Sequence, residues 1–250
     1  MPVSTQEDVD KAVSAARNAF KSWSQTPIEE RKEKLVAFAD AILEYKDKFA
    51  RLLTLEQGKP LSQADQEVDM ATTWLKAFSQ MDLPEEVIEE DEEKKIINRY
   101  TPLGVCCGIV PWNYPVLLAS GKIAPALLTG NTIIIKPSPF TPYCDLKLAE
   151  IGRKIFPPGV LQCLSGGDDL GPMLTAHPDI DKISFTGSSF TGKKVMESAA
   201  KTLKRITLEL GGNDPAIICE DVDIEKIIPK VRHARRPPLV PGNVDANSRF

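Results

Sequence analysis

From residue 103 onward, short apolar runs rich in β-type residues alternate with stretches of helical pattern. The apolar runs are GVCCGIV, NTIIIKP, GVLQCL, DKISFTG and RITLEL. Helices are predicted between them over 115–128, 144–156, 169–176 and 190–203. Strands separated by about one helix favour right-handed crossovers between parallel neighbours. The sequence therefore predicts an α/β fold with a doubly wound parallel sheet.

The first 83 residues have a helical pattern instead. One set of apolar residues at helical spacing is Val9, Val13, Ala16 and Phe20. A second set is Leu35, Phe38, Ile42, Leu43, Phe49, Leu52 and Leu53. Gly58 and Pro60 end this second segment, and a third helix is predicted over 63–78. We expect residues 1–83 to pack as helices on the sheet domain.

An acidic run, PEEVIEEDEEKK, separates these two parts of the chain. A run of like charge is usually a solvated edge rather than a binding site. We therefore interpret residues 84–102 as an exposed arm.

The composition excludes several classes of protein. The chain is 42% hydrophobic and 26% charged, with a net charge of −4, which gives no reason to expect a nucleic-acid surface. No apolar run approaches about 18 residues, so we expect a cytoplasmic protein that does not bind membranes. The five cysteines form no CxxC pair and there are two histidines. We therefore expect buried reduced thiols and no metal site.

Chemistry-bearing residues follow each expected strand. The motifs are PWNYP, KPSPFTP, SGGDD, FTGSS and ELGG. Parallel strands present their carboxyl ends at one edge of a sheet, where such folds bind ligands. In FTGSSFTGKK, the residues Gly187, Gly192 and Lys193 satisfy most of a P-loop pattern, but Lys194 replaces the Ser or Thr that holds Mg²⁺. A nucleotide triphosphatase is therefore only a weak alternative to a glycine turn that opens a helix onto an anion such as a pyrophosphate.

Three single residues at these strand ends are candidates for chemistry. Lys136 is either solvated or a contact to a ribose or phosphate. Asn113 is either a turn residue or a fixed N–H donor for a developing oxyanion. Glu209, between two leucines and before a glycine pair, is a candidate general base.

Taken together, the motifs resemble those of the NAD(P)-dependent aldehyde dehydrogenase superfamily. The motifs that carry the resemblance are TLEQGKP, VPWNYP, GNTIIIKPSPFTP, ISFTGSSFTGKKV and LELGGNDP, and it covers about residues 5–231. It implies a Rossmann-like cofactor domain over 103–231 and an oligomerisation arm over 84–102. It also implies oxidation of an aldehyde to a carboxylic acid, with a cysteine thiolate as nucleophile and NAD(P)⁺ as hydride acceptor.

The resemblance further implies roles for single residues. Asn113 would stabilise the oxyanion, Glu209 would be the general base, and Lys136 would contact the adenosine ribose. The remaining implied cofactor contacts, alongside Asn113 and Lys136, are Ile109, Pro111, Trp112, Gly167, Gly171, Phe185, Gly187, Ser188, Leu210 and Gly211.

The sequence departs from the family pattern in two places. The family's nucleophile lies some thirty residues beyond the general base in a G-Q-x-C segment, but the region here is RHARRPPLVPGNVDANSRF, without cysteine. We therefore expect a chain truncated before the catalytic cysteine and inactive as given, with an irregular basic tail over 232–250. That tail would come from a frame change, a retained intron, a premature end or a natural extension.

The alternative function is a non-catalytic dinucleotide-binding or interaction fragment, which could pair with an intact relative as a homo- or hetero-oligomer. The second departure is Pro139, which occupies a position where NAD-preferring members often carry a glutamate. No carboxylate there would repel a 2′-phosphate, so NAD and NADP both remain candidate cofactors.

Overall fold

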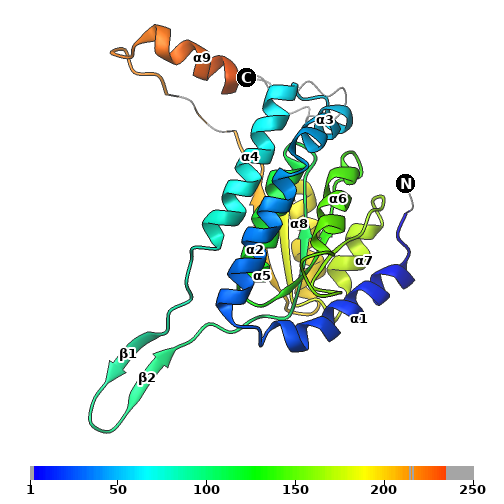
Figure 1. The fold of residues 1–250 in the computed structure, drawn as a ribbon, viewed down its shortest axis with the longest axis vertical. Coiled ribbons are helices and arrows are strands. Elements are labelled where there is room, and N and C mark those ends of the chain that lie inside the picture. Colours follow the sequence, from blue (N-terminus) through cyan, green and yellow to red (C-terminus); the bar gives the residue numbers. More distant parts are fainter. Residues whose placement is uncertain (1–2, 214, 216, 235–250) are drawn as a thin grey trace.

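The computed structural model, which describes residues 3–213, 215 and 217–234, confirms the α/β architecture (Figure 1). Five parallel strands form one sheet in the order β5-β4-β3-β6-β7. The strands are β3 Val105–Ile109, β4 Thr132–Lys136, β5 Leu161–Cys163, β6 Lys182–Gly187 and β7 Arg205–Leu210. The chain runs outward from β3 to β5 and then returns to place β6 on the other side of β3. The strand order therefore reverses between β3 and β6, which is where folds of this type bind ligands.

Helices cover both faces of this sheet. The crossover helices are α5 Pro115–Leu128, α6 Pro142–Gly152, α7 Leu170–Ala176 and α8 Ser189–Ala200. The N-terminal helices are α1 Gln6–Trp23, α2 Ile28–Leu43, α3 Lys46–Gln57 and α4 Leu61–Phe78. Where one helix was expected over residues 35–53, the chain turns after α2 and starts α3.

The alternation of side chains along β3 and β4 creates two cores. Cys106, Ile133 and Ile135 face a cluster built with α2 to α6. Cys107 and Ile134 face the opposite cluster, which includes α1, α7 and α8. Because both faces of these two strands are covered, every residue in them is buried.

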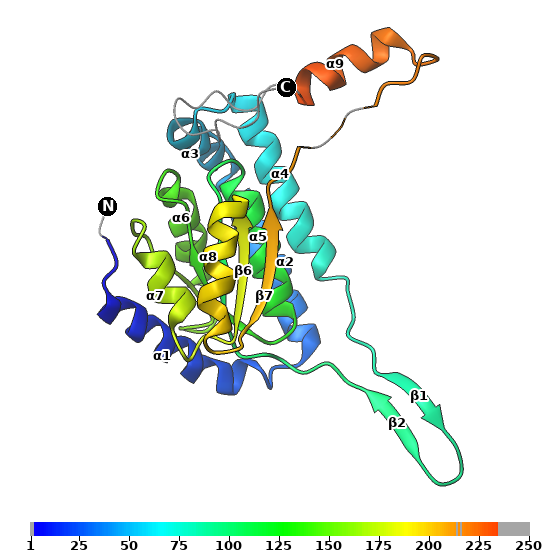
Figure 2. The same cartoon turned by 180° about the vertical axis from the view of Figure 1, so that it is seen from behind.

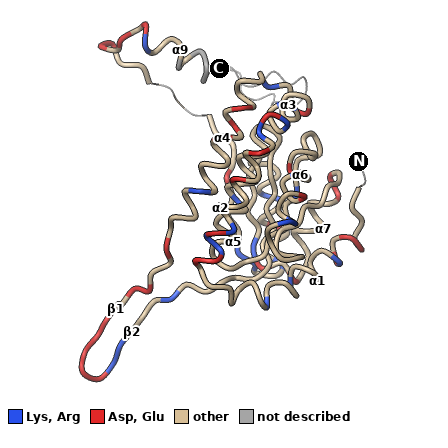
Figure 3. The backbone as a smooth tube through the Cα atoms, viewed as in Figure 1, with Lys and Arg blue, Asp and Glu red and all other residues tan. Residues whose placement is uncertain are grey.

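The acidic run forms a hairpin that projects from the body of the molecule (Figures 1 and 3). Strands β1 Glu86–Glu90 and β2 Lys95–Asn98 pair antiparallel, and every residue in both is exposed. Acidic side chains lie along β1, and Lys94 and Lys95 lie where β2 begins. Ion pairs such as Lys95 with Glu90 therefore cross the hairpin. The arm is exposed as expected, although the sequence analysis did not identify it as a hairpin.

The chain beyond β7 differs from expectation. The sequence PAIICEDVD after the glycine pair, which contains Cys219, predicts a further apolar strand, but none forms at the described residues 215 and 217–219. Ile217 is 88% exposed there, and a strand needs a neighbour to pair with and a core to cover it. Helix α9 Ile224–Ala234 follows and continues past 231, where we expected the irregular tail to begin. The rest of that tail, 235–250, lies outside the described residues.

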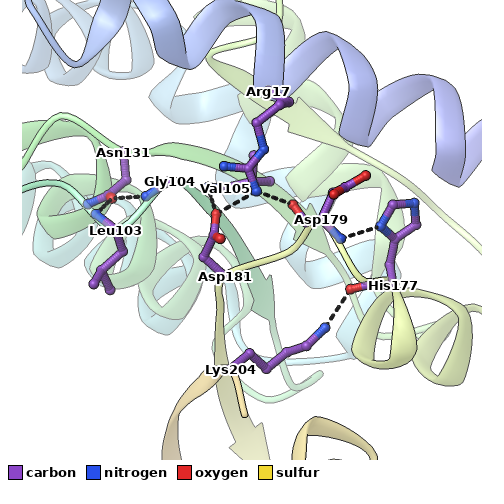
Figure 4. Close-up of polar contacts among 9 residues, drawn as sticks. All are labelled: Arg17, Leu103, Gly104, Val105, Asn131, His177, Asp179, Asp181 and Lys204. Atoms are coloured by element: carbon purple, nitrogen blue, oxygen red, sulfur yellow. Dashed lines mark hydrogen bonds and ion pairs between the residues drawn. The ribbon is translucent and has the colours of Figure 1, made fainter. Parts of the chain in front are cut away.

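The amino edge of the sheet is held by paired polar groups (Figure 4). Asp181, just before β6, accepts the Val105 N–H with its Oδ2 at 2.7 Å and also accepts Arg17 Nη2 of α1 at 2.7 Å. Gly104 has φ 132°, and an added Cβ would lie 2.0 Å from the same Asp181 oxygen. The tight contact between these loops therefore requires glycine.

Two further contacts complete this edge (Figure 4). Asn131 Oδ1 accepts the N–H groups of Leu103 at 2.6 Å and Gly104 at 3.0 Å. Lys204 Nζ donates to the His177 carbonyl at 2.6 Å. The loops that enter β3, β6 and β7 are therefore tied to α1, β4 and one another.

Two absences hold for the part of the chain that the structure describes. No helix in it is both long and apolar enough to cross a bilayer. It also contains no group of three or more His, Cys, Asp or Glu side chains suited to a metal ion.

Candidate functional site

The carboxyl ends of all five parallel strands lie at one edge of the sheet, opposite the edge of Figure 4. Residue pairing places Ile109 of β3 beside Phe185 of β6. It also places Thr186 beside Glu209 in β6 and β7, two strands that lie side by side in Figure 2. The loops that follow β3 and β6 therefore emerge next to each other at the point where the strand order reverses. The fold thus brings the predicted strand-end motifs to a common edge.

Lys136 ends β4 and is only 7% exposed. Its ammonium donates to the neighbouring Pro137 carbonyl at 3.0 Å, and this is its only hydrogen bond within the described residues. An ammonium has three donors, so two remain available. Burial lowers the pKa of Lys136, an effect that nearby Cys107 and Asp168 oppose. The result is a buried cation in need of an acceptor.

Helix α8 begins directly after β6, at the reversal point. Ser188 is its N-cap, and its Oγ accepts the Thr191 N–H at 3.2 Å. The other free N–H groups of the first turn and the helix dipole favour an anion here. Gly187 precedes the cap, and a Cβ on it would lie 2.7 Å from the Phe185 ring. Phe185 itself is buried in the cluster that includes α1, α7 and α8, and its ring packs against the turn at Gly187.

Three glycines at this edge face open space. A Cβ built on Gly167, Gly171 or Gly211 would meet no atom within 4 Å. Gly167 follows β5, Gly171 lies in the first turn of α7, and Gly211 follows β7. Leu210, the last residue of β7, is 43% exposed. The backbone along this edge is therefore open to a ligand on the side that these residues face.

Asn113 is half-buried in the loop from β3 to α5, after the half-buried Pro111 and Trp112. Its side-chain Oδ1 accepts the Tyr114 N–H at 3.1 Å. Only the amide oxygen can accept that hydrogen, so the side-chain NH₂ group takes no part in this hydrogen bond. It has no acceptor among the described residues, so Asn113 presents an unused N–H donor.

Glu209 is exposed on β7, and a buried lysine lies near it. Lys122 on α5 donates to Thr186 Oγ1 at 2.8 Å and to Ser184 Oγ at 3.1 Å. Burial lowers the pKa of Lys122 to about 8, and the Glu209 carboxylate partly opposes that shift. An exposed carboxylate therefore lies near a buried lysine whose pKa is lowered to about 8.

Most of the cysteine thiols are shielded from solvent. Cys106, Cys107 and Cys144 are buried and Cys163 is half-buried, all as free thiols. Burial raises the pKa of Cys106 and of Cys107 to about 12 and raises that of Cys144 and Cys163 as well. These four thiols are therefore poor nucleophiles. Cys219, which we had assigned to a strand, is exposed in a segment without one.

Four residues that hydrogen-bond to the strands and loops near this edge were not identified from the sequence. They are Lys122, Gln57, Lys59 and Glu67. Lys122 is the only charged residue of α5, PVLLASGKIAPALL, and a single charge in so apolar a helix was a usable signal. In the sequence, nothing distinguishes Gln57, Lys59 and Glu67 from ordinary polar residues, yet Lys59 is 1% and Glu67 0% exposed.

Comparisons with known proteins agree with this geometry. The chain is 49% identical over 231 residues to aldehyde dehydrogenase LUC3 of a Fusarium species, covering 92% of this chain and 49% of the relative. It is 41% identical over 242 residues to the chloroplastic betaine aldehyde dehydrogenase of Beta vulgaris, covering 91% and 48%. The chain therefore spans about half the length of the curated relatives it matches.

A solved structure matches equally well. Betaine aldehyde dehydrogenase of Staphylococcus aureus in complex with NAD⁺ superposes with a TM-score of 0.85 at 38% identity, covering 90% of this chain and 46% of that one. A model of the aldehyde dehydrogenase family matches residues 1–235. The chain belongs to the aldehyde dehydrogenase family.

Proposed function

We propose that this chain binds NAD⁺ or NADP⁺ along the carboxyl edge of its sheet and forms the dinucleotide-binding part of an aldehyde-oxidising enzyme. The observation that carries this proposal is the Lys136 ammonium, buried with two N–H donors unused among the described residues. Burial of a cation with unused donors costs free energy. Ribose hydroxyls placed against it would satisfy both donors.

Other features of this edge fit a dinucleotide. The first turn of α8 offers backbone N–H groups to a pyrophosphate, and Gly167, Gly171 and Gly211 leave open space along the same edge. The NAD⁺ complex of the Staphylococcus aureus relative supports the same class of ligand. Pro139 supplies no charge to repel a 2′-phosphate, so the proposal covers both dinucleotides.

The bound nicotinamide would supply hydride acceptance, and two residues of this chain would serve the aldehyde. The free N–H of Asn113 would stabilise an oxyanion as negative charge develops on the aldehyde oxygen. The Glu209 carboxylate would act as general base toward water. Both roles remain proposals that rest on position and chemical type.

A second candidate is a non-catalytic dinucleotide-binding module, and the buried thiols favour it for the chain as given. Four of its five cysteines are unsuited to attack by burial. The exposed Cys219 follows Glu209 too closely to match the family's nucleophile, so we expect no aldehyde oxidation. Partnership with an intact relative is part of this candidate. It is favoured by the arm, where Val87 is 48% and Ile88 53% exposed.

Calorimetric titration of the purified chain with NAD⁺ and with NADP⁺ tests the proposal. We expect saturable binding of at least one dinucleotide. The absence of heat with both, in a chain that circular dichroism shows to be folded, would reject it. Addition of an aldehyde separates the two candidates, because NAD(P)H formation that is lost in Glu209→Gln would exclude the non-catalytic module.

A further inference from the structure

The loop that carries Asn113 is held from outside the sheet domain. Its backbone carbonyl accepts two side-chain donors from the N-terminal helices, Gln57 Nε2 at 3.1 Å and Lys59 Nζ at 2.8 Å. Gln57 ends α3 and Lys59 follows two residues later. Gly58 between them is left-handed, with φ 83°, and this turn brings two nearby side chains onto one oxygen.

Lys59 is fixed in three directions. Its ammonium donates to the Asn113 carbonyl, pairs with Glu67 Oε2 on α4, and lies 4.0 Å from the centre of the Tyr114 ring. Three contacts use all the donors of an ammonium. With 1% of its surface exposed, Lys59 has no room for another arrangement.

Glu67 fixes the other end of the same loop. Its Oε1 accepts the N–H groups of Val116 at 3.0 Å and Leu117 at 3.2 Å, in the first turn of α5. Burial raises the pKa of Glu67, while Lys59 and the two backbone donors oppose that rise. Glu67 therefore ties α4 to α5, and Lys59 links the same carboxylate to Asn113.

This arrangement is poorly explained by stability alone. A buried ion pair is often no better for stability than an apolar pair of equal volume, and it constrains geometry far more. All of these contacts meet on a segment of five residues, 113–117, whose first side chain presents an unused N–H.

We propose that Gln57 and Lys59, held by Glu67, are positioning residues that fix the Asn113 peptide and thereby the direction of its side-chain amide. The inference rests on the function proposed above for Asn113. With the carbonyl held, the peptide plane that joins Asn113 to Tyr114 is fixed, and so is the Tyr114 N–H that donates to Asn113 Oδ1. The amide nitrogen then keeps one direction at the carboxyl edge, with little reorganisation needed when an oxyanion forms.

Hydrogen exchange measured by NMR on the full chain tests this. Two variants remove the donors without leaving an unpaired buried charge: Gln57→Met, and the double variant Lys59→Met with Glu67→Gln. The double variant keeps an acceptor for the α5 amides, so a folding defect is avoided. The control is Lys46→Met, which removes a lysine paired with Asp65 and Asp69 near the protein surface.

We expect the Tyr114 amide to exchange about tenfold faster in both variants, the loss expected for one hydrogen bond. The Asn113 side-chain NH₂ resonances should move as well. Asn131, held by three hydrogen bonds at the opposite edge, is the internal reference and should not change. A change at Asn113 that Asn131 does not share is a signature that general loosening would not give.

Unchanged Asn113 and Tyr114 signals in both variants would overturn the inference, as would equal changes at Asn131 or in Lys46→Met. Titration of the same samples with NAD⁺ keeps this apart from the proposed function. Failure of that function is seen as absent binding to the unaltered chain. Failure of the positioning role is seen in the Asn113 signals alone.

Discussion

The two edges of the sheet use polar residues in opposite ways. At the amino edge, Asp181, Asn131 and Lys204 each have protein partners at hydrogen-bond distance (Figure 4). At the carboxyl edge, Lys136 and the Asn113 amide keep donors that no described residue accepts. Paired groups stabilise a fold, whereas unpaired buried groups cost free energy and are retained where a ligand uses them. The contrast indicates that the amino edge holds the domain together, and it supports the proposal that the carboxyl edge binds a dinucleotide.

This contrast predicts the direction in which each mutation changes stability and dinucleotide affinity. Removal of an amino-edge polar group should destabilise the chain and leave dinucleotide affinity unchanged. Removal of a cation near the carboxyl edge should leave stability equal or higher.

Lys122 should impose a steep pH dependence on stability. Its pKa of about 8 in the folded chain lies below the usual 10.5, so between these values the unfolded chain holds a proton that the folded chain has lost. The free energy of unfolding therefore rises with pH in this window. Relative to Lys122→Met, it should rise by about 3 kcal/mol between pH 8 and 10.5.

Urea denaturation of both proteins at several pH values measures this difference. The comparison with Lys122→Met cancels the other titrating groups that the two proteins share. If the difference in unfolding free energy between the two proteins stayed constant from pH 8 to 10.5, Lys122 would not be desolvated by its packing against β6.

Asp181→Ala should cost about 2–3 kcal/mol of unfolding free energy, because the Val105 N–H and Arg17 lose a charged partner at once. Chemical denaturation measures the loss. The neighbouring Asp179→Ala is the matched control, since its side chain makes no hydrogen bond or ion pair within the described residues, and it should change stability by less than about 0.5 kcal/mol. Equal losses in the two variants would mean that the contacts of Asp181 with Val105 and Arg17 do not stabilise the amino edge.

Lys136→Met should weaken dinucleotide binding by about 1.5–3 kcal/mol, or roughly 10- to 150-fold, the range for hydrogen bonds to a charged group. Its unfolding free energy should stay equal or increase, because burial already disfavours the charge. Isothermal titration measures the affinity. Lys147→Met, at an exposed ion pair with Glu150, is the control that should bind normally.

Ser188→Ala should lower stability by about 1 kcal/mol through loss of the α8 N-cap. Thr5→Ala removes the N-cap of α1 and should cost a similar amount. The two differ in function, since only Ser188 lies at the carboxyl edge. Titration with NAD⁺ should detect weaker binding in Ser188→Ala alone, and parallel behaviour of the two variants would count against the anion site.

The sequence predicted those parts of the fold that depend on local pattern. The alternation of strands and helices gave the parallel sheet, and the residues that follow each strand gave the carboxyl edge. It could not reveal the pairing of Arg17 with Asp181, because 164 residues separate them. The burial of Lys59 and Glu67 was not predictable either, because it depends on how α4 packs against α5.

The expected strand after the glycine pair was wrong for a related reason. Its apolar composition suits a strand, but Ile217 and Ile218 remain exposed because no neighbour covers them. Local propensity is overridden when the tertiary partner is absent.

The most direct test of the contrast uses Asp181→Ala and Lys136→Met side by side. Unfolding free energy and NAD⁺ affinity are measured on the same preparations of each variant and of the unaltered chain. We predict that Asp181→Ala loses stability with unchanged affinity below its unfolding transition, and that Lys136→Met loses affinity with unchanged or higher stability. Loss of affinity in Asp181→Ala, together with normal binding by Lys136→Met, would contradict the assignment of holding to one edge and binding to the other.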